Sequence, residues 1–202
     1  MSRRPGQSGA DDADVEGARP EAAHEAQPQR QVELEAASGR DAADVDDLVA
    51  LPAEPVEQVG ALTSAGAENL AGKVVLDVSN PLDFSEGFPP TVVQPDGRSL
   101  GELLQATFPD AHVVKTLNTM GAEVMVAPRA LPGSHSVFVA GESPDAKAVA
   151  GDLLRGFGWQ SEEILDVGGI AAARGLELYL PLWLSLMGSL GARDFNISIV
   201  RA

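Results

Sequence analysis

The amino-acid sequence predicts an α/β fold in which βαβ units build a mostly parallel sheet. Two observations support this prediction. Short apolar runs indicate buried strands, and segments with apolar residues at helical spacing alternate with those runs. Open parallel sheets bind their ligands beyond the carboxyl ends of the strands, so polar residues at those ends are the first candidates for a functional site.

The predicted strands are apolar runs that end at polar or turn-forming residues. Four of them span residues 73–80, 112–117, 136–140 and 164–167. The first strand leads into Asn80-Pro81, a pair typical of a turn. A further segment, residues 195–200, alternates apolar and polar side chains, so we expect it to form an edge strand.

The predicted helices begin at capping signals. Ser99 and Glu102 fit a capping box, and apolar residues follow them at helical spacing up to Phe108. Ser143-Pro144 supplies an N-cap and a first-turn proline for a helix that we expect to end near Gly158. A longer apolar helical region runs from about residue 169 to 190, with a break or kink expected near its central proline.

Composition narrows the possible functions. A net charge of −16 argues against nucleic acid or an anionic membrane as a partner. The chain contains no cysteine, so it has neither a disulfide framework nor a thiol nucleophile, and this agrees with a cytoplasmic protein. No secretory signal is visible at the N-terminus, and the longest apolar stretch is too short to span a bilayer.

The first part of the chain differs from the rest. More than half of the net negative charge lies within residues 1–60, which contain no aromatic residue and no isoleucine. Such a segment has little apolar surface to offset the entropy lost on ordering. We therefore predict an acidic, poorly patterned, disordered or degenerate segment over residues 1–44 and a folded domain over residues 45–202. Poorly patterned secondary structure is the alternative for the first segment.

Polar residues gather at two predicted strand ends. The first strand leads into Asn80 and Pro81, and the second carries Lys115 and then Asn118, Thr119 and Met120. An asparagine amide both donates and accepts hydrogen bonds, which suits it to orient a nicotinamide carboxamide or a ribose hydroxyl without adding charge. The structural alternative is that Asn-Pro starts a turn and Asn-Thr caps the next helix. No catalytic residue and no metal ligand is predicted, and the scattered histidines receive no role.

Several motifs together resemble the NADPH-dependent F420 reductases, also known as NADP oxidoreductases. They are Asp77-Val-Ser-Asn-Pro-Leu, Phe88-Pro-Pro, Val114-Lys-Thr-Leu-Asn-Thr-Met120 and Ala173-Arg174-x-x-Glu177, in the order and spacing of that family. The resemblance covers about residues 45–202. It implies a Rossmann-type, doubly wound parallel sheet with a short helical C-terminal extension, and hydride transfer between NADP(H) and the deazaflavin F420 or another small acceptor.

The resemblance also assigns residues. Asn80 and Pro81 would line the cofactor site, and Lys115, Asn118, Thr119 and Met120 would lie near the nicotinamide and the acceptor ring. Ser2, Arg3 and Arg4 resemble the family segment in which a hydroxyl and guanidinium groups hold the 2′-phosphate of NADP. Arginine suits that role because it stays charged and binds phosphate through two donors.

The family's first strand, G-x-G-x-x-G loop and helix are not recognisable in this sequence. That loop normally lets the backbone approach the cofactor's pyrophosphate. Gly6-Gln-Ser-Gly9 is a poor substitute, because acidic residues that would repel phosphate follow it. We therefore expect an N-terminally incomplete chain. A mis-chosen start, a truncation and a frame shift remain equal alternatives.

Two interpretations of function stay open at this point. One is an NADP-dependent reductase, and the other is a non-catalytic remnant or dimerising module that binds no dinucleotide. The apolar run at residues 176–190 is either core or a subunit interface, with Tyr179, Trp183 and Met187 as anchors, and the resemblance favours a homodimer. Within the same region, Arg174 and Glu177 are spaced to pair on one helix face, either as a solvated salt bridge or as part of the site. The identity of the hydride acceptor cannot be read from the sequence.

Overall fold

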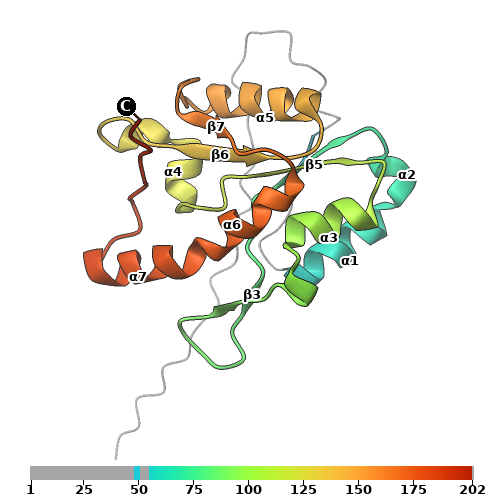
Figure 1. Ribbon diagram of the computed structural model, residues 1–202, viewed down its shortest axis with the longest axis horizontal. Coiled ribbons are helices and arrows are strands. Elements are labelled where there is room, and N and C mark those ends of the chain that lie inside the picture. The colour runs from blue at the N-terminus through green and yellow to red at the C-terminus, as the bar shows by residue number, and fades with distance from the viewer. Residues whose placement is uncertain (1–47, 51–54, 202) are drawn as a thin grey trace, which may run out of the picture. The chain divides into compact units, whose positions relative to one another are not determined.

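A computed structural model describes residues 48–50 and 55–201 (Figure 1). The predicted segment 1–44, with Ser2, Arg3 and Arg4, lies outside the described residues, so its interpretation stays a prediction. The strands are β1 (Leu48–Ala50), β2 (Val74–Asp77), β3 (Leu82–Asp83), β4 (Thr91–Val92), β5 (His112–Thr116), β6 (Val137–Ala140) and β7 (Ile164–Asp166). The α-helices are α1 (Pro55–Ala65), α2 (Ala67–Leu70), α3 (Leu100–Thr107), α4 (Ala122–Val126), α5 (Pro144–Gly156), α6 (Ala173–Leu178) and α7 (Leu180–Leu190).

In the described residues, one sheet has the strand order β1-β2-β5-β6-β7. Pairings β1–β2, β2–β5 and β6–β7 are parallel, so the predicted mostly parallel sheet is confirmed. The β5–β6 pairing is antiparallel and departs from the doubly wound prediction. The connection between these two strands contains only α4 and a short 3₁₀ turn, Pro128–Ala130. A five-residue helix is only about 7.5 Å long, too short to span the sheet and return the chain to the opposite edge.

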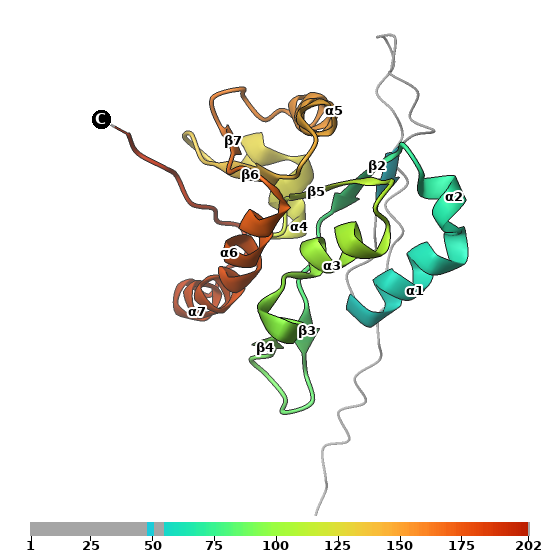
Figure 2. The ribbon, with the colours of Figure 1, turned by 45° about the vertical axis from the view of Figure 1, so that its right-hand side comes forward.

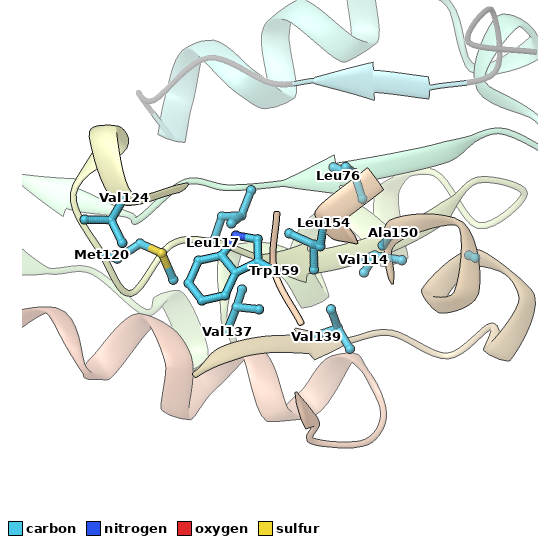
Figure 3. Packing of buried hydrophobic residues seen from close by; sticks show 11 residues of the cluster. Leu76, Val114, Leu117, Met120, Val124, Val137, Val139, Ala150, Leu154 and Trp159 are labelled. Atoms are coloured by element: carbon cyan, nitrogen blue, oxygen red, sulfur yellow. The ribbon is translucent and has the colours of Figure 1, made fainter. Parts of the chain in front are cut away.

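Both faces of the sheet are buried, because neighbouring residues of a strand point to opposite sides. Val75 and Val113 belong to one apolar cluster, which also contains residues of α3, whereas Leu76 and Val114 belong to a second cluster, which also contains residues of α5. Figure 2 shows α3 and α5 on opposite sides of the strands, and Figure 3 shows the second cluster around Trp159. Helices on both faces are what near-continuous apolar strands require.

The predicted capping signals are confirmed. The Ser99 side chain accepts a hydrogen bond from the Glu102 backbone N–H, and the Glu102 carboxylate accepts one from the Ser99 backbone N–H. Ser143 caps α5 by accepting from Ala146, with Pro144 at the first turn. That helix ends at Gly156, two residues before the predicted stop.

The predicted break in the C-terminal helical region is also confirmed. A 3₁₀ turn (Ile170–Ala172) leads into α6, and α7 follows with Pro181 in its first turn. Within the part of the chain that the structure describes, residues 170–190 form the one helical stretch long and apolar enough to cross a membrane. Core helices meet the same criterion, so length and composition alone are weak evidence for a span.

The segment after α7 does not form the predicted edge strand, so that prediction is wrong. No ladder of backbone hydrogen bonds joins this segment to the sheet in the described residues. Ser136, just before β6, makes two hydrogen bonds to it. Its N–H donates to the carbonyl of Ile197 at 2.8 Å, and its hydroxyl accepts from the N–H of Ile199 at 3.2 Å. The Asn196 side chain adds contacts to His135 and to the Ser136 carbonyl, so mostly side-chain bonds hold the segment beside the sheet without extending it.

Candidate functional site

The ends of β2 and β5 meet, as the strand-end argument predicts. Asp77 is the register partner of Lys115 in the parallel pairing of these strands. Asn80 and Asn118 each follow three residues after that pair. The Asn80 Nδ2 donates to the backbone carbonyl of Asn118 at 2.8 Å, and the Asn118 Nδ2 donates to the Asn80 Oδ1 at 2.9 Å. Two segments 38 residues apart in sequence therefore form a reciprocal amide pair.

Three buried oxygens at the end of β5 and just after it have no hydrogen-bond partner within the described residues. They are the Asn118 Oδ1 and the hydroxyl oxygens of Thr116 and Thr119. An unsatisfied buried polar group costs about 1–3 kcal/mol, and such groups in a native fold call for a specific explanation. Three of them within four consecutive residues indicate a place where polar atoms of a bound molecule or water complete the hydrogen bonding.

The backbone at this strand end is strained. Leu117 has φ = 63°, a left-handed conformation that is a genuine outlier for a bulky residue. The Asn118 N–H donates to the Thr116 carbonyl at 2.8 Å, which closes a tight three-residue turn. Strain of this kind costs about 1–3 kcal/mol and clusters at ligand sites. Because the Leu117 side chain is buried in the second apolar cluster, packing holds the turn in place.

Beneath the amide pair lies a buried charge cluster. The Lys115 ammonium is 2.9 Å from the Asp77 Oδ2 and 2.9 Å from the Glu177 Oε1, and none of the three side chains is exposed. The sequence predicts Lys115 near the nicotinamide, but the structure turns its ammonium into the protein, between two carboxylates. Direct contact between Lys115 and a ligand therefore stays a prediction. In the structure, its ammonium pairs with the carboxylates of Asp77 and Glu177.

Glu177 closes this cluster from α6. Its carboxylate accepts hydrogen bonds from the backbone N–H groups of Leu100 at 3.0 Å and Gly101 at 3.2 Å, at the start of α3. The positive end of a helix dipole favours a carboxylate at this position. Two carboxylates around one ammonium leave one excess negative charge, and the α3 N-terminus offsets it. Sequence reasoning missed this partnership, because the Glu177 motif alone does not indicate which residues it contacts.

The predicted Arg174–Glu177 pair is wrong. Arg174 instead donates through Nε to the Glu102 Oε2 at 2.6 Å, and its Nη2 contacts the other oxygen of that carboxylate. A bidentate pair with a guanidinium is geometrically stronger than the single contact that an i,i+3 neighbour offers. Arg174 and Glu177 therefore both join α6 to α3, one at the surface and one in the core.

We expect the Arg174–Glu102 pair to stabilise the fold only above acidic pH. Hydrogen bonding to Arg174 lowers the Glu102 pKa from its ordinary 4.5 to about 2. A depressed carboxylate pKa adds stability that is fully present above pH 4.5 and is lost as the pH falls toward 2. Thermal unfolding of the wild type and Glu102→Gln should therefore show a melting-temperature gap that narrows over this range. A gap independent of pH would contradict the assignment.

Gly101 lets α3 approach α6 closely. A Cβ at this position would lie 3.1 Å from the Ile170 Cδ1 and 3.2 Å from the Ala173 Cβ. We therefore expect Gly101→Ala to destabilise the protein by about 1–3 kcal/mol, through overpacking beside the Glu177 contacts. Gly175→Ala is the matched control, because its Cβ would meet nothing within 4 Å. Urea unfolding of both variants measures the difference, and equal stability would refute the close-packing argument.

The remaining predicted site residues flank the amide pair. Pro81 is buried, and its carbonyl accepts a hydrogen bond from the Val93 N–H at 2.8 Å. Met120 is buried in the second apolar cluster, and the Asn196 Nδ2 approaches its sulfur to 4.0 Å. Ser79, which the sequence argument passes over, donates to the Asp77 carboxylate from both its N–H and its hydroxyl.

Comparison with known proteins places the chain in a family. It is similar to a crystal structure of a candidate F420-dependent NADP reductase from Arthrobacter sp. FB24. The two share 51% sequence identity with a TM-score of 0.73, and the match covers 77% of this chain and 70% of that one. This chain belongs to the F420-dependent NADP reductase family. The same match confirms the Rossmann-type fold class and supports the resemblance carried by the sequence motifs.

A second relative is more distant. The chain is 33% identical over 122 residues to metalloreductase STEAP3 of Rattus norvegicus. That match covers 58% of this chain but only 22% of STEAP3, so the chain corresponds to less than a quarter of that protein's length. No protein-family model matches the sequence.

Proposed function

We propose that this chain is an NADP-dependent oxidoreductase in which the ends of β2 and β5 hold the nicotinamide of NADP(H). Hydride passes between that ring and F420 or another small acceptor. Membership of the reductase family supports the NADP-linked class, and both relatives are named as reductases. The observation on which the proposal rests is the Asn80–Asn118 amide pair with its unpartnered buried oxygens.

The residues at this strand end fit a carboxamide. A nicotinamide carboxamide carries one NH₂ donor and one carbonyl acceptor. The Asn118 Oδ1 can accept from that NH₂, and the unpartnered hydroxyls of Thr116 and Thr119, which flank it in sequence, are the candidate donors to the carbonyl. Because Asp77 and Glu177 neutralise Lys115, the cluster presents no unpaired cation here. A neutral group suits this environment better than a phosphate or a carboxylate does.

The protein's own contribution is placement of the reacting ring. NADP(H) supplies the hydride itself, at its nicotinamide ring, so the reaction needs no protein nucleophile. The Asn118 amide orients the ring by its hydrogen bonds, and the Leu117 turn fixes that amide without reorganisation on binding. Such fixed geometry lowers the entropic barrier to transfer. We assign no catalytic residue within the described part of the chain.

We expect the 202-residue chain to bind NADPH weakly. The proposed site would hold only the nicotinamide end, whereas no glycine loop for the pyrophosphate is recognisable in the sequence. A titration that follows NADPH fluorescence measures the affinity. Micromolar binding would contradict this expectation, because the cofactor's phosphates would then be held without a recognisable glycine loop.

Hydride transfer tests the function directly. We expect the chain, at high NADPH concentration, to reduce F420 in proportion to the NADPH oxidised. Free flavin mononucleotide serves as the second acceptor, because its ring takes up a hydride as a unit. Turnover with either acceptor supports the reductase. If neither acceptor is reduced even at saturating NADPH, the non-catalytic module is the better account.

We further propose that the chain acts as a cytoplasmic homodimer that binds neither nucleic acid nor membrane. In the described residues, exposed apolar side chains lie on α6 and α7, at Leu178 and Leu182, and in the loop between β3 and β4, at Phe88. Trp183 stacks on Phe195 with ring centroids 5.4 Å apart, so this predicted interface anchor is engaged within the chain. Sedimentation equilibrium should give twice the chain mass, and a monomer at all concentrations would contradict the dimer.

A further inference from the structure

We propose that Glu177 is a positioning residue for the nicotinamide site. Although it lies on α6, it sets the place of the Asn118 amide through the Lys115 ammonium. This inference deepens the proposed function and rests on it, because the amide it positions is the one proposed to orient the nicotinamide. The contacts that carry it join three elements: β2, β5 and α6.

The register of the two strands couples the charge cluster to the amide pair. Asp77 and Lys115 are 38 residues apart in sequence, and so are Asn80 and Asn118. The ion pair lies at the last register position of the parallel β2–β5 pairing, and the amide pair follows three residues later in each segment, just beyond the strand ends. A shift of β5 against β2 that lengthened the ion pair would also separate the two amides.

The Lys115 ammonium is shared between two carboxylates. Asp77 draws Lys115 toward β2, and Glu177 draws it toward α6, each at 2.9 Å. In a buried environment with low effective dielectric these attractions are strong, and loss of one partner moves the cation toward the other. Removing the Glu177 charge should therefore pull the Lys115 end of β5 toward Asp77.

Glu177 is itself firmly held. Its carboxylate accepts from the backbone N–H groups of Leu100 and Gly101, and its side chain is fully buried. It thus links the position of the α6–α7 extension and the start of α3 to the strand end. Arg174 joins the same two helices through Glu102, but that exposed pair makes no contact with Lys115.

This difference supplies a matched pair of variants. Glu177→Gln removes the charge that reaches Lys115, whereas Glu102→Gln removes a charge that joins the same helices without reaching it. Two readouts are needed. One is the side-chain NH₂ resonances of Asn80 and Asn118 in ¹⁵N-labelled protein, assigned with Asn80→Ala and Asn118→Ala. The other is kcat and KM for NADPH in the F420 assay.

We expect Glu177→Gln to shift both side-chain amide resonances and to lower kcat about tenfold, with KM changed less than about twofold, because placement of the ring rather than binding is affected. Glu102→Gln should leave the resonances and kcat close to the wild type. Unshifted amide resonances in Glu177→Gln, or equal shifts in both variants, would overturn the inference.

Two safeguards keep this test decisive. If Glu177→Gln does not fold, Glu177→Asp takes its place, because it keeps the charge but withdraws the carboxylate from Lys115 by one methylene. The same resonance shifts are expected of it, and their absence counts against the inference. If the wild type transfers no hydride, the proposed function fails, whereas the amide resonances, which need no activity, still decide the role of Glu177.

Discussion

Replacing Lys115 with methionine should cost about 3–5 kcal/mol of folding free energy. The substitution leaves the carboxylates of Asp77 and Glu177 facing each other in the core without their shared cation. Removing one partner of a buried ion cluster is far more damaging than replacing the whole cluster with apolar groups. Urea unfolding followed by circular dichroism measures the loss as a lower transition midpoint.

Lys147→Met is the matched control for this variant. Lys147 pairs with Asp166 at 2.8 Å, but the Asp166 side chain is more than half exposed. Pairs of this exposed kind contribute about 0–1 kcal/mol, so the control should remain close to the wild type. If Lys115→Met were no less stable than Lys147→Met, the cluster would not have the structural weight given to it here.

Asn118→Ala should lower hydride transfer by about 100-fold, because misplacement of a reacting ring by about 1 Å costs that much. It should cost folding only about 1 kcal/mol, since the lost hydrogen bond to Asn80 is a single neutral one. Steady-state rates with NADPH and F420, set against urea midpoints, separate the two effects.

Asn69→Ala provides the comparison for that experiment. Asn69 lies in α2 and donates to the Ala65 carbonyl in an exposed hydrogen bond that involves neither Asn80 nor Asn118. Its loss should leave the rate unchanged. An unchanged rate in Asn118→Ala as well would remove Asn118 from the site and return the amide pair to a purely structural role.

Local patterns were sufficient to predict most of the described fold. The apolar runs predict β2, β5, β6 and β7, and the Ser99–Glu102 and Ser143–Pro144 signals predict the starts of α3 and α5. These features depend on neighbouring residues in the sequence, and they can therefore be predicted from it. The antiparallel β5–β6 pairing could not be predicted in this way, because it depends on the path that the short connection takes in space.

The candidate site also has one part that the sequence predicts and one part that it does not. The meeting of Asn80 and Asn118 follows from two facts that the sequence carries: strands that run parallel, and polar residues where they end. The positive φ of Leu117 could not be predicted from the sequence, because glycine or asparagine, and not leucine, usually marks that conformation.

Long-range charge partners are the part that local reasoning could not reach. Spacing along one helix suggested that Arg174 pairs with Glu177, yet each finds a better partner on another element. The buried position of Lys115 likewise depends on Glu177, which lies 62 residues later in the chain. Only the packing of α6 against α3 and β5 brings these groups together.

The central claim is that the Asn80–Asn118 pair receives the nicotinamide end of the cofactor. Titrating ¹⁵N-labelled protein separately with reduced nicotinamide mononucleotide and with adenosine 2′,5′-bisphosphate tests it most directly, because the two halves of NADPH are examined apart. We predict that the nicotinamide half shifts the side-chain NH₂ resonances of Asn80 and Asn118, and that the adenosine half leaves them in place. If the nicotinamide half moved neither resonance at saturation, the claim would be contradicted.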